Sequence, residues 1–87
     1  KTGTMPADVK GQTAQCLKNI RAIVEAAGAN LADVVRVGAF LKDLADFAAF
    51  NEVYETFFSK PYPVRTTVQA TPPGCLVEMD AIVRLKT

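Results

Sequence analysis

The chain has 87 residues, of which 49% are hydrophobic, and its ten basic and nine acidic side chains leave a net charge of +1. This length suits one small domain with a thin stability margin, which association with further copies would widen. The near-neutral charge argues against nucleic acid or an anionic membrane as partner, no apolar run reaches the roughly 18 residues that span a bilayer, and the first residues lack signal-peptide order. We therefore expect one domain over residues 1–87 that acts on small molecules in the cytoplasm or an organelle matrix.

The first half of the chain predicts one long helix and one strand. Apolar residues recur at three- and four-residue steps between Val9 and Ala27, and Pro6 and Gly28 suit the two ends, so we expect a helix over about 6–27. The segment 34–41 is β-branched at three positions and apolar on nearly both faces. That profile is typical of a strand in the middle of a sheet.

The second half predicts a second helix, which Asp46 is placed to cap. Its aromatic residues follow the helical period: Phe47, Phe50, Tyr54 and Phe57 or Phe58. So many rings suggest a stacking platform for bases, but their spacing places them on one helix face, which favours core packing.

Two strands follow, one in the segment 61–69 and one over about 75–84, with a Thr-Pro-Pro-Gly loop between them. The order helix, strand, helix, strand, strand indicates an α+β fold. Its two helices cover one face of a three-stranded sheet and leave the other face for a second subunit.

Alternation along the last two strands places Arg65, Thr67 and Gln69 on one face, and Glu78 with Asp80 on one face of the next strand. If the apolar faces share one core, the guanidinium and the two carboxylates lie in the same layer on the bare face, as a site for an anion and proton transfer. The plainer interpretation is that Arg65 pairs with Glu78 or Asp80 on a wet sheet face.

The run Tyr-Pro-Val-Arg-Thr-Thr-Val at 62–68, followed by Gly-Cys-Leu-Val-Glu-Met-Asp-Ala-Ile at 74–82, resembles the signature of the RidA (YjgF) family of imine and enamine deaminases. The likeness extends upstream in the same order and spacing, through Pro6-Ala7-Asp8-Val9, Leu41-Lys42-Asp43 and Phe50-Asn51 with Tyr54. It therefore covers essentially the whole chain.

The resemblance implies a chorismate-mutase-like trimer with sheets inward, helices outward and ligand clefts between subunits. It implies hydrolysis of 2-iminobutanoate- or 2-iminopropanoate-like substrates without metal or organic cofactor. Arg65 then binds the substrate carboxylate, because its planar fork suits two parallel hydrogen bonds. Glu78 handles the water. Thr67 lines the pocket, and Asn51 matches a family asparagine whose other interpretation is a structural amide; Asp80 is taken as mainly structural.

The sequence has no histidine, and Cys16 and Cys75 lack metal-ligand spacing, so we expect neither a zinc site nor a Cys–His nucleophile. Members of the family carry further strands ahead of the segment that matches Lys1, which leaves open a fragment or a short member. Two other functions stay open: a trimer that binds carboxylates without catalysis, and a ribonuclease or translation inhibitor, which the charge supports poorly.

Overall fold

The computed structural model describes residues 8–60, 62–71 and 74–85. Helix α1 spans Val9–Ala26, and Asp8 is its N-cap, with a side-chain oxygen that accepts a hydrogen bond from the Gly11 N–H at 2.8 Å. The predicted start at Pro6 lies outside the described residues. At the other end, Gly28 has a φ of 88°, as predicted for a residue that ends a helix in the left-handed region.

The Asp8 cap gives the first testable prediction. Changing Asp8 to alanine removes the acceptor of the Gly11 N–H, and we expect the free energy of unfolding to fall by about 1 kcal/mol. Urea denaturation followed by circular dichroism measures this loss. Asp8→Asn keeps an acceptor and should lose only a few tenths of that amount; equal losses in the two variants would contradict the cap.

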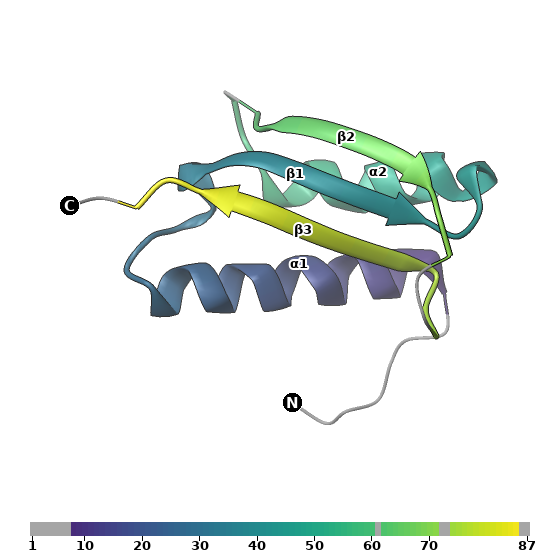
Figure 1. Ribbon diagram of the computed structural model, residues 1–87, viewed down its shortest axis with the longest axis horizontal. Coiled ribbons are helices and arrows are strands. Elements are labelled where there is room, and N and C mark those ends of the chain that lie inside the picture. Colours follow the sequence, from purple (N-terminus) through teal and green to yellow (C-terminus); the bar gives the residue numbers. More distant parts are fainter. Residues whose placement is uncertain (1–7, 61, 72–73, 86–87) are drawn as a thin grey trace.

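The three strands form one sheet in the order β2-β1-β3 (Figure 1). The central strand β1 (Val34–Leu41) runs parallel to β2 (Val64–Gln69) and antiparallel to β3 (Val77–Val83). The prediction of β1 as a central strand with an apolar composition is therefore confirmed. The 3₁₀ turn Leu31–Asp33 precedes β1, and its Asn30 and Asp33 form a reciprocal capping box.

Helix α2 (Phe47–Phe57) follows a 3₁₀ turn, Leu44–Asp46. Asp46 occupies the N-cap position of α2 but makes no side-chain cap hydrogen bond, so its expected capping role is wrong. The carboxylate of Asp43 instead accepts from the Ala45 N–H at 2.9 Å and caps the preceding turn. The turn continues into α2 without a break, so the extended residue that can act as a cap is Asp43, three positions before Asp46.

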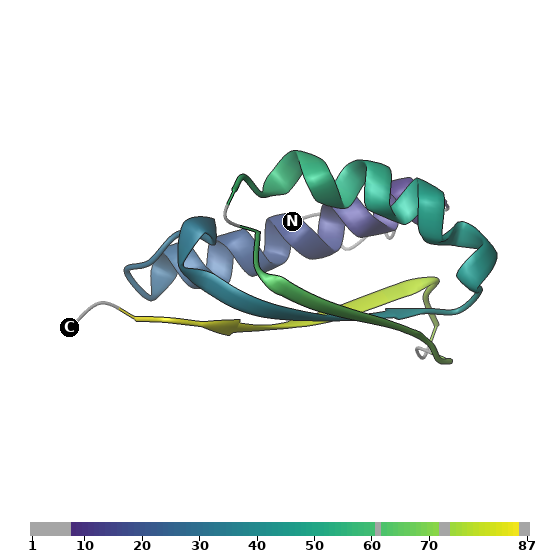
Figure 2. The same cartoon turned by 90° about the horizontal axis from the view of Figure 1, so that it is seen from above.

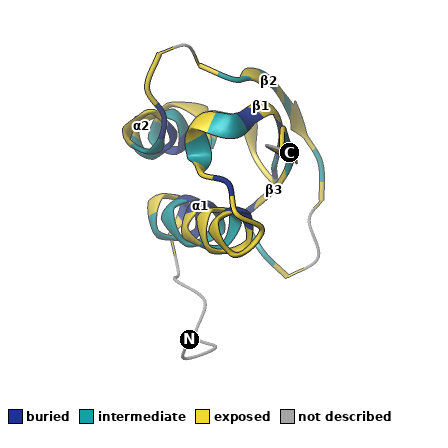
Figure 3. Ribbon diagram, turned by 90° about the vertical axis from the view of Figure 1, so that its left-hand side faces the viewer, coloured by how far each residue is buried: buried dark blue, intermediate teal, exposed yellow. Residues whose placement is uncertain are grey.

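Both helices lie side by side on one face of the sheet (Figures 2 and 3). The core between the helix layer and the sheet contains fully buried side chains from both layers, among them Leu17, Val37, Leu41, Phe50 and Val77. Gln12 is also buried, and its side-chain oxygen accepts a hydrogen bond from the Leu76 N–H at 2.7 Å. This contact joins α1 to the segment that enters β3. Within the described residues, no helix is both long and apolar enough to cross a bilayer.

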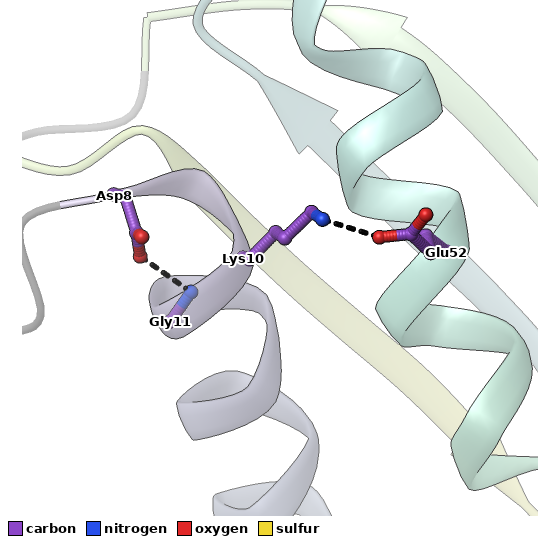
Figure 4. A network of polar contacts seen from close by, with 4 residues as sticks. All are labelled: Asp8, Lys10, Gly11 and Glu52. Atoms are coloured by element: carbon purple, nitrogen blue, oxygen red, sulfur yellow. Dashed lines mark hydrogen bonds and ion pairs between the residues drawn. The ribbon is translucent and has the colours of Figure 1, made fainter.

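The outer surfaces of the two helices are joined by an ion pair between Lys10 and Glu52 (Figure 4). Their hydrogen bond raises the pKa of Lys10 and lowers the pKa of Glu52. Both side chains are more than half exposed, at 53% and 68%, so the pair adds little to stability.

The opposite face of the sheet has no covering layer among the described residues. Several of its apolar side chains are exposed: Val64 at 64%, Val68 at 41% and Ile82 at 58%. Residues paired across the ladder share a face, and the register therefore also places Arg36, Phe40 and Glu78 on this side. A half-apolar surface of this kind is typical of an interaction face.

Candidate functional site

Arg65 lies on the helix-covered face of the sheet, not on the bare one. In the parallel ladder Arg65 pairs with Val37, which is fully buried beneath the helices, and Thr67 pairs with Ala39 in the same way. The side chains of Val64, Thr66 and Val68 point the other way and are exposed. The expectation that the apolar residues of β2 face the core is therefore wrong.

The physical reason is that helix α2 offers Arg65 an aromatic surface and a hydrogen-bond acceptor. The guanidinium carbon lies 4.6 Å from the ring centroid of Tyr54, 5.2 Å from that of Phe47 and 5.6 Å from that of Phe50. These distances are within the range of cation–π attraction. Phe50 and Tyr54 are buried in the core as predicted, whereas Phe47 is 37% exposed. These three rings also surround the Arg65 guanidinium.

Asn51 completes the surroundings of Arg65. Its Oδ1 accepts a hydrogen bond from Arg65 Nη1 at 2.6 Å, while its Nδ2 donates to Glu55 Oε2 at 2.9 Å. The two charged neighbours fix which side of the amide faces the guanidinium. The structure thus brings Asn51 and Arg65 together, two of the residues that the sequence proposed for one site.

An open pocket of about 270 Å³ lies beside this pair. Its lining consists of Asn51, Tyr54, Glu55, Tyr62, Pro63 and Arg65. In the described residues the ion pair between Lys10 and Glu52 is the sole salt bridge, so Arg65 has no carboxylate partner. A half-buried guanidinium that lines a pocket without a counter-ion is suited to bind an anionic group.

Two buried hydroxyl groups near this region lack a hydrogen-bond partner in the described structure, those of Tyr54 and Thr67. Burial raises the pKa of Tyr54, and the positive charge of Arg65 opposes this rise. The Tyr54 hydroxyl therefore stays protonated at neutral pH. Thr67 shares the helix-facing side of β2 with Arg65, but it is not among the residues that line the pocket.

Glu78 lies on the other side of the sheet from Arg65. Glu78 pairs with Phe40 in the antiparallel ladder, whereas Arg65 pairs with Val37 in the parallel ladder. Val37 and Phe40 are three positions apart on β1, so their side chains point to opposite faces of the sheet. The expected common layer of Arg65 with Glu78 and Asp80 is therefore wrong within one chain, and so is a pairing of Arg65 with either carboxylate. The two faces differ because β2 turns its polar residues inward and β3 turns its polar residues outward.

Asp80 has a structural contact of its own. Its Oδ1 accepts a hydrogen bond from the backbone N–H of Gly38 at 3.1 Å, and a Cβ at position 38 would overlap this oxygen. The glycine in the central strand thus makes room for the Asp80 carboxylate. This contact agrees with the interpretation of Asp80 as a structural residue.

Sequence reasoning missed Tyr54, Glu55, Tyr62 and Pro63 as pocket residues. The signal for Glu55 was its position four residues after Asn51, which places both on one side of the helix. Tyr54 gave no separate signal, because it follows the same spacing as the core residues Phe50 and Phe58. In the described ranges no cluster of three or more His, Cys, Asp or Glu side chains has the arrangement of a metal site.

The sequence of this chain is similar to those of known proteins. The family model described as Endoribonuclease L-PSP matches residues 1–85. The chain is 45% identical over 87 residues to the 2-iminobutanoate/2-iminopropanoate deaminase of Escherichia coli K12, covering 94% of this chain and 68% of that protein. Across the first three curated relatives it matches, the chain spans between 61% and 68% of their length.

Two solved structures share the fold closely. RidA from the Antarctic bacterium Psychrobacter sp. PAMC 21119 gives a TM-score of 0.90 at 44% identity, covering 97% of this chain and 70% of that one. TdcF of Escherichia coli, solved with bound serine, gives a TM-score of 0.88 at 42% identity and covers 97% and 71%. The predicted α+β order of elements, with both helices on one face, is thus the fold of these relatives.

Proposed function

The chain belongs to the Endoribonuclease L-PSP family, which is the RidA (YjgF) family, and from this premise we propose that it hydrolyses reactive 2-imino or 2-enamino acids to 2-oxo acids and ammonia. Relatives at 42% to 45% identity are named 2-iminobutanoate/2-iminopropanoate deaminases. We extend that activity to this chain as a proposal, with short 2-imino acids as the substrate class.

One observation supports the proposal most directly. Arg65 is held half-buried beside an open pocket by Asn51 and the rings of α2, without a carboxylate partner among the described residues. A substrate carboxylate would supply the missing counter-charge through hydrogen bonds to the guanidinium nitrogens. TdcF, which was solved with bound serine, shows that a close relative accepts a small molecule carrying a carboxylate.

The proposed reaction adds water to the imine carbon. A carboxylate takes a proton from the water as its oxygen bonds to that carbon, and the tetrahedral intermediate then loses its nitrogen as ammonia after proton transfer. The oxygen remains on the 2-oxo acid, so no electrons are exchanged with a cofactor. Because imines hydrolyse on their own, positioning and modest acid–base help are sufficient. We assign the carboxylate role to Glu78.

Glu78 and Arg65 lie on opposite faces of their own sheet, so this assignment requires a second copy of the chain. We propose a homotrimer in which the uncovered sheet faces meet and a Glu78 from a neighbouring copy reaches the Arg65 pocket. The exposed Val64, Val68 and Ile82 support an association through that face. Thr67 lies outside the pocket lining but on the same face of β2 as Arg65, and we propose that it contacts a substrate that extends beyond the pocket. We place the reaction in the cytoplasm or an organelle matrix.

A second candidate is carboxylate binding without catalysis. The separation of Glu78 from Arg65 favours it, because a single chain provides the anion site without the proposed proton carrier. Ribonuclease activity, which the family description names, has less support, because a net charge of +1 gives little attraction to a polyanion.

A trapping assay tests the proposed reaction. An L-amino acid oxidase supplies 2-iminobutanoate, and semicarbazide captures the imine that escapes hydrolysis. Wild type is expected to lower the rate of semicarbazone formation. Glu78→Gln should reduce this effect at least a hundredfold, because the amide cannot accept the proton from water.

Asp80→Asn is the matched control, because it removes a carboxylate from the same strand face and keeps an oxygen that accepts from Gly38. Its activity should stay within about threefold of wild type. If wild type leaves semicarbazone formation unchanged while 2-oxobutanoate still binds, the binding function replaces the enzymatic one. If both Glu78→Gln and Asp80→Asn keep full activity, Glu78 is not the proton carrier.

A further inference from the structure

We propose that Tyr54 is a positioning residue, whose ring holds the Arg65 guanidinium in the orientation that binds a substrate carboxylate. The proposal rests on the proposed function for the role of Arg65 and adds a residue that sequence reasoning treated as core packing alone. Of the three rings around the guanidinium, that of Tyr54 is the nearest, at 4.6 Å from Arg65 Cζ.

The Tyr54 ring is itself held firmly. The residue is only 4% exposed, and its ring lies between those of Phe50, at 5.6 Å, and Phe58, at 4.9 Å between centroids. An arginine side chain loses much rotamer freedom when it is ordered. A fixed ring beneath the guanidinium therefore reduces the side-chain entropy that Arg65 loses when the substrate binds.

A ring positions the cation in a way that a carboxylate cannot. A carboxylate partner would occupy N–H donors of Arg65 and cancel its charge, leaving less of both for the substrate. Attraction to an aromatic face uses no N–H donor and leaves the positive charge in place. The hydrogen bond to Asn51 occupies a donor on Nη1, so Arg65 keeps further donors for a carboxylate.

The hydroxyl of Tyr54 is not what holds Arg65. It is buried without a hydrogen-bond partner among the described residues, whereas the ring makes the contact with the guanidinium. Phenylalanine at position 54 should therefore preserve the positioning, and leucine should not. The expected difference between these two variants separates the ring from the hydroxyl.

The experiment compares Tyr54→Leu, Tyr54→Phe and Phe57→Leu. We expect Tyr54→Leu to raise both KM for 2-iminobutanoate and Kd for 2-oxobutanoate about fivefold to tenfold, with kcat within about twofold of wild type. Tyr54→Phe should match wild type in both constants. Phe57→Leu removes a partly buried ring of the same helix that contacts Arg21 instead of Arg65, so it should lower thermal stability without raising Kd.

A measurement on Arg65 itself does not depend on activity. In wild type, the Arg65 side-chain NMR signals should show ring-current shifts and restricted motion of the Nε–H bond. Tyr54→Leu should reduce both but not abolish them, because the rings of Phe47 and Phe50 and the hydrogen bond to Asn51 remain. If Tyr54→Leu does not fold, Tyr54→Met takes its place, because methionine fills the space without an aromatic face. Unshifted, freely moving Arg65 signals in wild type would overturn the inference.

The outcomes separate this inference from the proposed function. If wild type neither binds 2-oxobutanoate nor hydrolyses the imine, the proposed function fails, while the NMR signals still report whether Tyr54 holds Arg65. If wild type binds and hydrolyses normally but Tyr54→Leu leaves KM and Kd unchanged, the positioning role fails alone. An equal rise of Kd in Phe57→Leu would assign the effect to a general loss of packing and would also overturn the positioning role.

Discussion

Changing Arg65 to lysine is expected to lower kcat/KM for 2-iminobutanoate about a hundredfold and to weaken binding of 2-oxobutanoate to a similar degree. Lysine keeps the charge but loses the planar fork, the hydrogen bond from Nη1 to Asn51 and the stacking on the rings of α2. Each hydrogen bond to a charged group contributes about 1.5–3 kcal/mol, so the loss of one or two accounts for this factor. Semicarbazide trapping and calorimetric titration with 2-oxobutanoate measure the two effects.

Arg21 offers a matched control for this substitution. Its guanidinium carbon lies 5.5 Å from the ring centroid of Phe57, so Arg21→Lys removes a comparable cation–π contact away from the pocket. Activity of Arg21→Lys should remain within about twofold of wild type. If Arg65→Lys retains wild-type kcat/KM and affinity, the guanidinium does not bind the substrate carboxylate, and the proposed role of Arg65 is wrong.

Changing Phe50 to alanine is expected to cause the largest loss of stability. Phe50 is fully buried where α2 packs on the sheet, and removal of a buried phenylalanine ring costs about 3–5 kcal/mol. Domains are stable by only about 5–15 kcal/mol, and small ones lie at the lower end. We expect a large decrease in the urea midpoint, measured by circular dichroism at a fixed protein concentration.

Phe47 is the matched control, because it lies on the same helix and its ring packs near that of Phe50, but its side chain is 37% exposed. Phe47→Ala should cost clearly less, about 1 kcal/mol, since less apolar area leaves water on folding. Equal costs for the two substitutions would mean that Phe50 is not at the centre of the core.

The order of elements could be predicted from local patterns. The helical spacing of Val9, Thr13, Leu17 and Val24 and the doubly apolar stretch of β1 each depend on one element alone, and both predictions are confirmed. The pairing order β2-β1-β3 follows less directly, but a strand with apolar residues on both faces belongs in the middle. The N-cap of α1 could not be predicted from spacing, because it depends on the hydrogen bond that the Asp8 side chain accepts from the Gly11 N–H.

The faces of β2 could not be predicted from its own alternation. Val64 and Val68 are more apolar than Arg65 and Thr67, so a strand considered alone would turn the valines inward. The structure does the opposite, because α2 provides a ring surface and the Asn51 carbonyl for the guanidinium. These contacts of Arg65 come from a second element, α2, so the pattern of β2 alone does not reveal them. The family resemblance identified Arg65 and Asn51, which the structure brings into a hydrogen bond. The roles of these two residues in substrate binding remain proposals, as do those of Glu78 and Thr67.

The position of β1 in the sheet has a consequence for biosynthesis. Both strands that hydrogen-bond to β1 follow it in the chain, β2 after helix α2 and β3 after a further loop. A nascent polypeptide that has released β1 from the ribosome therefore carries a doubly apolar strand with both of these partners still unmade. Pairing of β1 with β2 waits until Gln69 has been synthesised, and pairing with β3 waits until Val83 has been synthesised. Chaperones that shield extended apolar segments are therefore expected to engage this chain at residues 34–41 during translation.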